Sequence, residues 1–174
     1  FPELEKVYQS STLFEAFDRR IPDKGRVDYQ EVLTSLGLPP TADRMDILRE
    51  TRGMISGDPY SFEEPLRLED KELITNFYIN GMRHQEHLPV NWYDYLTIGE
   101  ELIPFKDNDN PIDQFAIKIK TKNDMELGYI PGIYAQAVYA LLSRGVHVSL
   151  KVLDIRHHMA PQWWVRVELK STVD

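Results

Sequence analysis

The second half of the chain alternates between apolar and polar residues, which is the pattern of half-buried β-strands. Residues 115–120 read Phe-Ala-Ile-Lys-Ile-Lys, and residues 146–152 alternate in the same way. Other short segments are rich in β-branched and aromatic residues, as strands are. These segments lie at 74–79, 101–105, 126–130 and 163–169. The pattern therefore predicts five or six short strands.

One clear helix interrupts the predicted strands. Residues 133–143 are mostly Ala, Leu and other apolar residues, and Gly145, of a type that commonly ends helices, follows them. Short strands combined with one or two helices are typical of a small, closed or partly closed β-barrel. We therefore expect such a barrel over residues 66–174.

The first part of the chain indicates three short helices instead. We expect the first to begin at Ser10 or Ser11, the second at Asp28 and the third at Thr41 or Asp43. Side chains of these types accept hydrogen bonds from the first backbone N–H groups of a helix. Helices this short depend on tertiary packing for their stability.

The boundary between the two parts is predicted from glycine and proline. Residues 53–65 contain two of each, and such residues favour turns and loops over regular elements. The sequence therefore predicts an α+β protein, with a small helical region over 1–60 followed by the barrel over 66–174.

Charge limits the kind of ligand that the chain can bind. The formal net charge is −8, and residues 1–74 carry 10 basic and 16 acidic side chains, against 10 and 12 in residues 75–174. Non-specific binding to duplex DNA requires many Lys and Arg side chains to neutralise phosphates. Any contact with nucleic acid is therefore expected to be local and to lie in the second half.

Composition excludes several other classes of protein. The chain has no cysteine, which excludes disulfide scaffolds, thiolate chemistry and cysteine zinc sites and fits a reducing cytoplasm. No apolar run approaches the roughly 18 residues that a membrane span requires. We expect a cytoplasmic protein with no membrane partner.

Four sequence pieces occur in a particular order. They are Gly-Met-Arg-His at 81–84, Ile-Gly-Glu-Glu-Leu at 98–102, Asn-Pro-Ile-Asp-Gln-Phe-Ala-Ile at 110–117 and Leu-Gly-Tyr-Ile-Pro at 127–131. In this order they resemble the HIRAN domain family, and the similarity covers residues 75–170. The helical region before them is similar to the region that precedes HIRAN domains in some small bacterial proteins.

The resemblance implies a six-stranded barrel related to OB folds, of a kind frequently attached to DNA-repair and remodelling enzymes. It also implies a site for the free 3′ end of single-stranded DNA, in which Asp113 contacts the terminal hydroxyl, beside Asn110, and Arg83 follows the first strand. A carboxylate accepts a hydrogen bond from a hydroxyl but repels a phosphate, which an arginine can hold with two hydrogen bonds. We include His84 and Tyr129 in the same candidate site.

Two positions differ from the family pattern. Ile112 stands where the DNA-end binder has an aromatic residue, and Pro131 with Gly132 stands where it has a basic pair. The chain therefore lacks part of the aromatic surface on which bases stack, at roughly 1–3 kcal/mol per base. His84 occupies a second aromatic position of the family and keeps a ring that can stack.

The same residues also allow structural roles. Asn110 and Asp113 can form a tight turn by accepting hydrogen bonds from nearby backbone N–H groups, and Arg83 can form an ion pair at the barrel rim. The aromatic residues Trp92, Tyr93, Trp163 and Trp164 are candidates for base stacking or for a protein interface, although aromatic side chains are more often core. Because adjacent residues of a strand point to opposite faces, we expect one of the last two to be exposed.

Motifs for catalysis and metal binding are absent from the sequence. It contains no Gly-rich phosphate loop, nucleophile elbow or Ser/His/Asp set in a recognisable context. His84 and His87 lack a third ligand at a suitable spacing, and the segment that begins at Asp107 lacks the Gly and Glu of a calcium loop. We expect no enzymatic activity, no cofactor and no metal.

Two functions stay open at this point. The first is a non-enzymatic bacterial module that binds single-stranded DNA 3′ ends, or a related nucleic acid, in DNA repair or defence. The second is a protein-interaction module, accessory to a HipA-like kinase of a toxin–antitoxin system. In that case the acidic helical region and exposed aromatic residues bind the partner, and the barrel is a scaffold.

Overall fold

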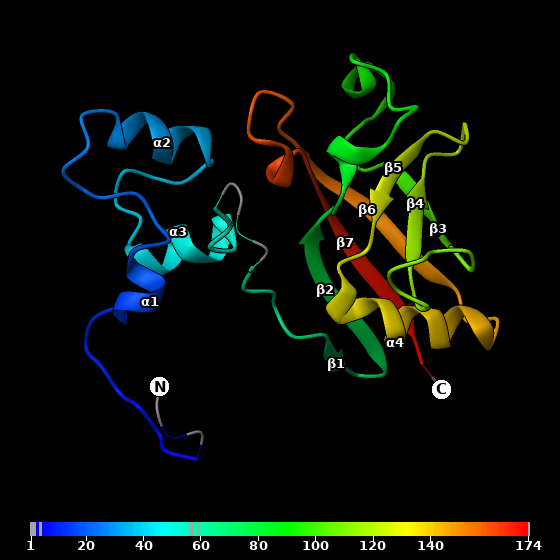
Figure 1. Ribbon diagram of the computed structural model, residues 1–174, viewed down its shortest axis with the longest axis horizontal. Coiled ribbons are helices and arrows are strands. Elements are labelled where there is room, and N and C mark those ends of the chain that lie inside the picture. Colours follow the sequence, from blue (N-terminus) through cyan, green and yellow to red (C-terminus); the bar gives the residue numbers. More distant parts are fainter. Residues whose placement is uncertain (1–2, 4, 56–57, 59, 174) are drawn as a thin grey trace. The chain divides into compact units, whose positions relative to one another are not determined.

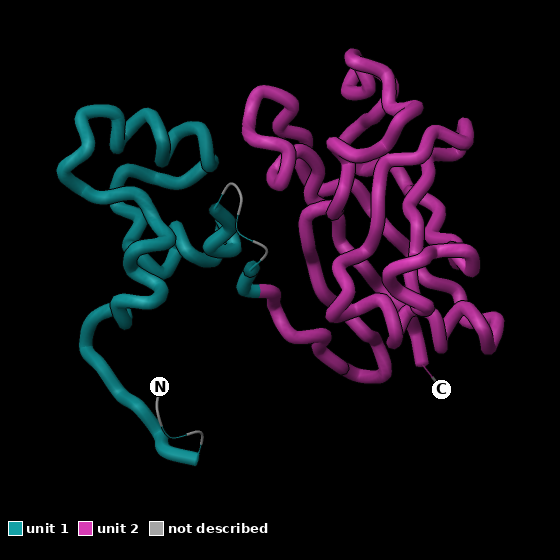
Figure 2. The backbone as a smooth tube through the Cα atoms, in the orientation of Figure 1, with its two compact units in different colours: residues 1–62 teal, residues 63–174 magenta. Residues whose placement is uncertain are grey.

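The computed structural model describes residues 3, 5–55, 58 and 60–173. The chain forms two compact units, Phe1–Phe62 and Glu63–Asp174 (Figures 1 and 2). The division into a helical region over 1–60 and a barrel domain over 66–174 stays a prediction, which limited proteolysis can test.

The first unit contains three short helices, α1 (Glu15–Asp18), α2 (Tyr29–Ser35) and α3 (Arg44–Thr51). Arg20 pairs with Asp58 at 2.6 Å, and Arg44 pairs with Asp18 at 2.6 Å. The buried apolar residues of the unit are Ile21, Tyr29, Leu33, Leu36, Ala42, Ile47 and Leu48. This packing provides the tertiary support that helices of one or two turns need.

The helix starts agree only partly with the prediction. Asp43 caps α3: its carboxylate accepts the backbone N–H of Asp46 at 2.8 Å, and the Asp46 carboxylate accepts that of Asp43 at 3.0 Å. The predicted cap at Ser10 or Ser11 is wrong, because α1 begins four residues later, after Phe14, with no side-chain cap. The reciprocal capping box of Asp43 and Asp46 at α3 satisfies two backbone N–H groups that have no partner within the helix.

Asp28 precedes α2 as predicted but does not cap it with its side chain. Its two carboxylate oxygens accept hydrogen bonds from Arg26 Nε and Nη2, at 2.9 and 2.7 Å. This forked pairing orients the carboxylate toward the arginine. The position of the helix start was predictable from the residue type, whereas the bond that its side chain makes was not.

The second unit is built on one antiparallel sheet (Figure 1). Its seven strands are β1 (Arg67–Glu69), β2 (Glu72–Tyr78), β3 (Glu101–Lys106), β4 (Ile117–Lys120), β5 (Glu126–Tyr129), β6 (Val148–Ile155) and β7 (Val165–Thr172). They are arranged in the order β1-β2-β7-β6-β3-β4-β5. The last strand of the chain therefore lies between the second and the sixth.

One face of this sheet carries the hydrophobic core. Every second residue is buried along β7 and along β6 as far as Val152, as the alternation in the sequence predicted. Helix α4 (Gly132–Ser143) crosses near one end of the strands in Figure 1. It contributes Tyr134, Ala135, Val138 and Leu141 to the buried residues. Three short 3₁₀ helices, η1 (Met82–His84), η2 (Trp92–Tyr95) and η3 (Pro161–Trp163), lie in the connections.

The α+β class is as expected, but the barrel of five or six strands is not confirmed. The sheet has seven strands, and its ladder does not close into a ring. A single bridge links Asn80, just after β2, to Tyr129 in β5, with N···O distances of 2.9 and 2.8 Å. The strand that sequence reasoning missed, β1, is exposed at all three residues, so it has no apolar alternation to detect.

The strand predicted over 163–169 begins later than expected. Trp163 ends η3 and Trp164 follows it, so β7 starts only at Val165. The argument that these two rings lie on opposite faces of a strand is therefore wrong, and both side chains are half-buried. Among the residues that the structure describes, no helix is long and apolar enough to cross a membrane.

Candidate functional site

The loop between β3 and β4 contains the Asn-Pro-x-Asp sequence. The side-chain oxygen of Asn110 accepts the backbone N–H groups of Ile112 and Asp113, each at 3.0 Å. Asp113 Oδ1 accepts the N–H of Phe115 at 2.8 Å. Both polar side chains thus have the turn-forming role that their types favour. Asp113 Oδ2 makes no hydrogen bond to any residue of the described ranges, so this oxygen can still accept one from a ligand.

Asp107, at the start of this loop, connects it to β5. Its Oδ2 accepts hydrogen bonds from the Tyr129 hydroxyl at 2.9 Å and from Asn110 Nδ2 at 3.1 Å. Burial raises the pKa of Tyr129 above 10.0, and the hydrogen bond to Asp107 raises that pKa further. The phenol therefore stays protonated at neutral pH and acts as a donor, which fixes the carboxylate and, through it, Asn110.

Tyr129 also connects the site to the segment after β2. Its backbone forms the bridge to Asn80, and its ring lies next to Gly81, where an added Cβ would be 3.6 Å from Tyr129 Cδ2. The neighbouring Gly128 has φ +150°, and a Cβ there would collide with the Asn80 carbonyl oxygen. Glycine is therefore required at 128, because another backbone passes directly over it.

Arg83 and His84 lie on η1, immediately after this contact. Met82 is buried and anchors the turn, while Arg83 and His84 are exposed. Arg83 Nε donates a hydrogen bond to His84 Nε2 at 2.9 Å. Within the described ranges the Arg83 Nη groups have no partner, so they are available to an anion.

The structure thus brings some of the predicted residues together and leaves others apart. Asn110 and Tyr129 meet at Asp107, and Tyr129 contacts the start of the turn that carries Arg83 and His84. No hydrogen bond or ion pair in the described part of the chain joins Arg83 to Asp113. Sequence reasoning missed Asp107 as the connecting residue, because the only signal was its acidic type within a polar loop.

The Lys118 ammonium near the loop is paired with carboxylates and adds no free positive charge. Lys118 on β4 lies 3.9 Å from Asp107 and 3.3 Å from Glu126. Burial lowers the pKa of Lys118, but the hydrogen bond to Glu126 and the nearby carboxylates outweigh it, so the pKa is raised overall and the ammonium stays charged. Ile112 is 93% exposed at the tip of the loop, where it offers an apolar contact and no ring.

The candidate aromatic residues have different environments. Trp92 is 3% exposed and belongs to the core. Trp164 lies 5.5 Å from it between ring centroids, and its Nε1 donates to the Met159 carbonyl at 2.9 Å. Tyr93 stacks on His157, with 4.0 Å between centroids and 21° between planes. His157 had no sequence signal, since its partner is far away along the chain.

Among the residues that the structure describes, no group of three His, Asp or Glu side chains could hold a metal ion. Two groups of the site have hydrogen-bonding capacity left over in the described ranges, the Nη groups of Arg83 and Oδ2 of Asp113. The first can hold a phosphate, and the second can accept a hydrogen bond from a hydroxyl.

Comparison with known proteins gives a family match and two similar structures. The model of the HIRAN domain family matches residues 74–171. No curated protein sequence matches the chain. A protein from Lactobacillus plantarum is similar to this chain at 18% identity and a TM-score of 0.49, over 57% of this chain and 96% of its own. The HIRAN domain of human HLTF is similar at 16% identity and a TM-score of 0.45, over 57% and 74%.

Proposed function

Because the chain belongs to the HIRAN domain family, whose members are in general nucleic-acid-binding modules, we propose that it binds the free 3′ end of single-stranded DNA or of a related nucleic acid. The proposed site comprises Arg83, His84, Asn110, Asp113 and Tyr129. Asp113 Oδ2 accepts the terminal hydroxyl, and the Arg83 guanidinium holds a phosphate. The module has no catalytic role of its own.

The observation that carries this proposal is the network centred on Asp107. It holds the Asn110 turn through Nδ2 and the β5 strand through the Tyr129 hydroxyl, at 3.1 and 2.9 Å. Asp113 is thereby fixed with one oxygen bonded to Phe115 N–H and the other uncommitted. A preorganised acceptor loses little freedom on binding, which favours affinity.

The carboxylate of Asp113 explains why the 3′ end of a strand would be bound in preference to an internal nucleotide. A carboxylate stabilises a hydroxyl donor and repels a phosphate oxygen. A strand that continued past this point would place a phosphate against the carboxylate. The acidic neighbour Asp107 opposes any extended backbone contact, so recognition is expected to be confined to the terminal nucleotides.

The test uses two short single-stranded oligonucleotides that differ only in a 3′-hydroxyl or a 3′-phosphate. We expect the hydroxyl form to bind about tenfold more tightly, and Asp113→Asn to reduce that ratio toward unity while keeping the bond to Phe115. Asp109→Asn, at an exposed position in the same loop, is the matched control and should leave the ratio unchanged. Equal binding of both oligonucleotides to the unmodified protein would contradict the proposal.

Cellular roles follow as further parts of the same proposal. A 3′-end binder suits DNA repair or defence in a bacterial cytoplasm, where it would direct an associated activity to broken or single-stranded ends.

Aromatic side chains at the margin of the site would stack on the bases of the bound strand. We assign this role to Tyr93 and Trp163. Trp92 and Trp164 support the core instead, since their rings pack on each other.

A second candidate function, a protein-interaction module of a HipA-like kinase system, has one observation in its favour. The first unit has its own buried core and yet exposes large apolar side chains, including Tyr60 at 69% and Met45 at 48%. Purification of the full chain from its native host tests this function. Recovery of a stoichiometric kinase that is lost with Tyr60→Ser would support it, and recovery of nucleic acid alone would exclude it.

A further inference from the structure

The pairing of β3 with β6 stops after two residues. Glu101 and Leu102 pair with β6, and β3 then continues along β4 alone. Continuing the register from Leu102 would place Pro104 opposite Val148. Proline has no N–H to donate to a ladder. The two strands therefore separate at this point.

Backbone groups on the β6 side point into the resulting gap. Val152 exchanges hydrogen bonds with the β3 side, donating to the Glu100 carbonyl at 2.9 Å and accepting from Gly99 at 2.8 Å. Groups of an antiparallel strand alternate between its two neighbours, so those of Val148, four residues earlier, face the same way. Because Pro104 has no N–H, the position opposite Val148 lacks the backbone hydrogen bond that a regular sheet would form there.

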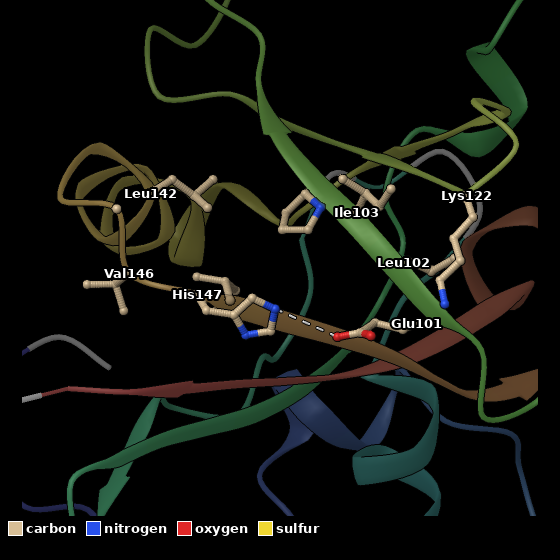
Figure 3. Close-up of a pocket in the computed structure, with 10 residues that line it drawn as sticks. Glu101, Leu102, Ile103, Lys122, Leu142, Val146 and His147 are labelled. Carbon is tan, nitrogen blue, oxygen red and sulfur yellow. Dashed lines mark ion pairs between the residues drawn. The ribbon is translucent and has the colours of Figure 1, made fainter.

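The gap is a cleft of about 460 Å³ between β3 and the turn that leads from α4 into β6 (Figure 3). Leu102 and Val148 are buried at its floor. Ile103, Leu142 and Val146 line its walls, and Ile103 is 47% exposed. A volume of this size lies in the range of specific binding pockets, and its apolar walls suit one or two aliphatic side chains.

The rim of the cleft carries charges of both signs. His147 Nε2 lies 3.9 Å from Glu101 Oε1, which Figure 3 marks with a dashed line. Lys122, on the β4–β5 turn, also lines the cleft, and it makes no ion pair within the described ranges. An unneutralised ammonium beside an apolar cleft is notable in a chain of net charge −8, and it is complementary to a carboxylate.

We propose that this cleft is a docking groove for an extended peptide segment of a protein partner. The segment would insert an aliphatic side chain between Ile103 and Leu142 and place an Asp or Glu near Lys122. Its backbone N–H would supply the donor that Pro104 lacks, as peptides do when they add to an open sheet position. The groove shares no residue with the proposed nucleic-acid site, so a failure of one proposal does not affect the other.

Selection from a displayed library of random heptapeptides, with the full chain as target, tests the proposal. We expect enriched peptides to combine an aliphatic residue with a neighbouring Asp or Glu. Their affinity should fall about tenfold or more in Ile103→Glu and stay unchanged in Leu153→Glu. Leu153 is the matched control, because it is an exposed aliphatic residue of β6 outside the cleft, at 39%.

A second variant keeps the test informative if Ile103→Glu fails to fold. Pro104→Val restores the N–H, so it should let β3 pair with Val148, close the cleft and abolish peptide binding without lowering the melting temperature. No enrichment, or binding that Ile103→Glu and Pro104→Val both leave intact, would overturn the proposal. Self-association in sedimentation that Ile103→Glu abolishes would also overturn it, because the occupant would then be a second copy of the chain.

Discussion

The hydroxyl of Tyr129 donates a hydrogen bond to the Asp107 carboxylate at 2.9 Å, and this bond joins β5 to the loop that follows β3. Tyr129→Phe removes the donor and leaves a largely buried carboxylate with fewer partners. We expect the free energy of unfolding to fall by about 1–2 kcal/mol, measured by urea denaturation. Tyr95→Phe, at an exposed hydroxyl elsewhere in the same unit, should change it by much less.

Stability should also depend on pH through Tyr129. Burial and the bond to Asp107 raise the pKa of its phenol above 10.0 in the folded state. A group whose folded pKa is raised contributes stability that is complete below its unfolded pKa and is lost as the pH rises through its folded value. The difference in unfolding free energy between wild type and Tyr129→Phe should therefore be constant up to about pH 9 and shrink above pH 10. A difference that does not change with pH would contradict this assignment.

Gly128 should tolerate no side chain. At φ +150° an added Cβ would collide with the Asn80 carbonyl and come within 2.9 Å of Ile79 Cγ2. Gly128→Ala should therefore lower the unfolding free energy by about 3 kcal/mol or more and detach η1 from β5. At Gly132, where a Cβ would meet nothing within 4 Å, substitution by Ala should be neutral or slightly stabilising. Thermal denaturation of the two variants measures the contrast.

Nucleic-acid binding should depend only weakly on salt. Each phosphate neutralised by a cation contributes about −0.7 to the slope of log K against log salt concentration for a single strand. With Arg83 as the main phosphate contact, the slope should lie near −1, and Arg83→Gln should make it shallower by about 0.7. Arg144→Gln, an exposed cation at the end of α4, should leave it unchanged. A steep slope that survives Arg83→Gln would place the phosphate contacts elsewhere.

The strands of the second unit were largely predictable because burial follows the alternation of apolar residues. The pattern around Ile117 and Ile119 and the pattern along β6 both match buried positions. By contrast, β1 lies at the sheet edge, where all its side chains are exposed and no alternation arises. Pro161 allows a 3₁₀ turn before β7, so the strand starts later than its aromatic residues indicated.

The local turn at the candidate site was predictable from its residue types, whereas the contacts that connect it to other elements were not. Asn110 and Asp113 belong to a local turn, whose side-chain bonds span two or three residues. The bond from Tyr129 to Asp107 spans 22 residues, and the stack of Tyr93 on His157 depends on two separate loops. Such contacts are set by the order of strands in the sheet, which the alternation of residues does not specify.

The position of β7 between β2 and β6 has a consequence for how the protein is made. Until β7 emerges from the ribosome, the long strand β2 has only the three-residue β1 as a partner. At 5–20 residues per second, the interval between the synthesis of Tyr78 and that of Thr172 is roughly 5 to 20 s. During this time β2 presents an unpaired edge to other chains. Protection of that edge by chaperones during translation, rather than the stability of the finished sheet, is expected to limit the yield of folded protein.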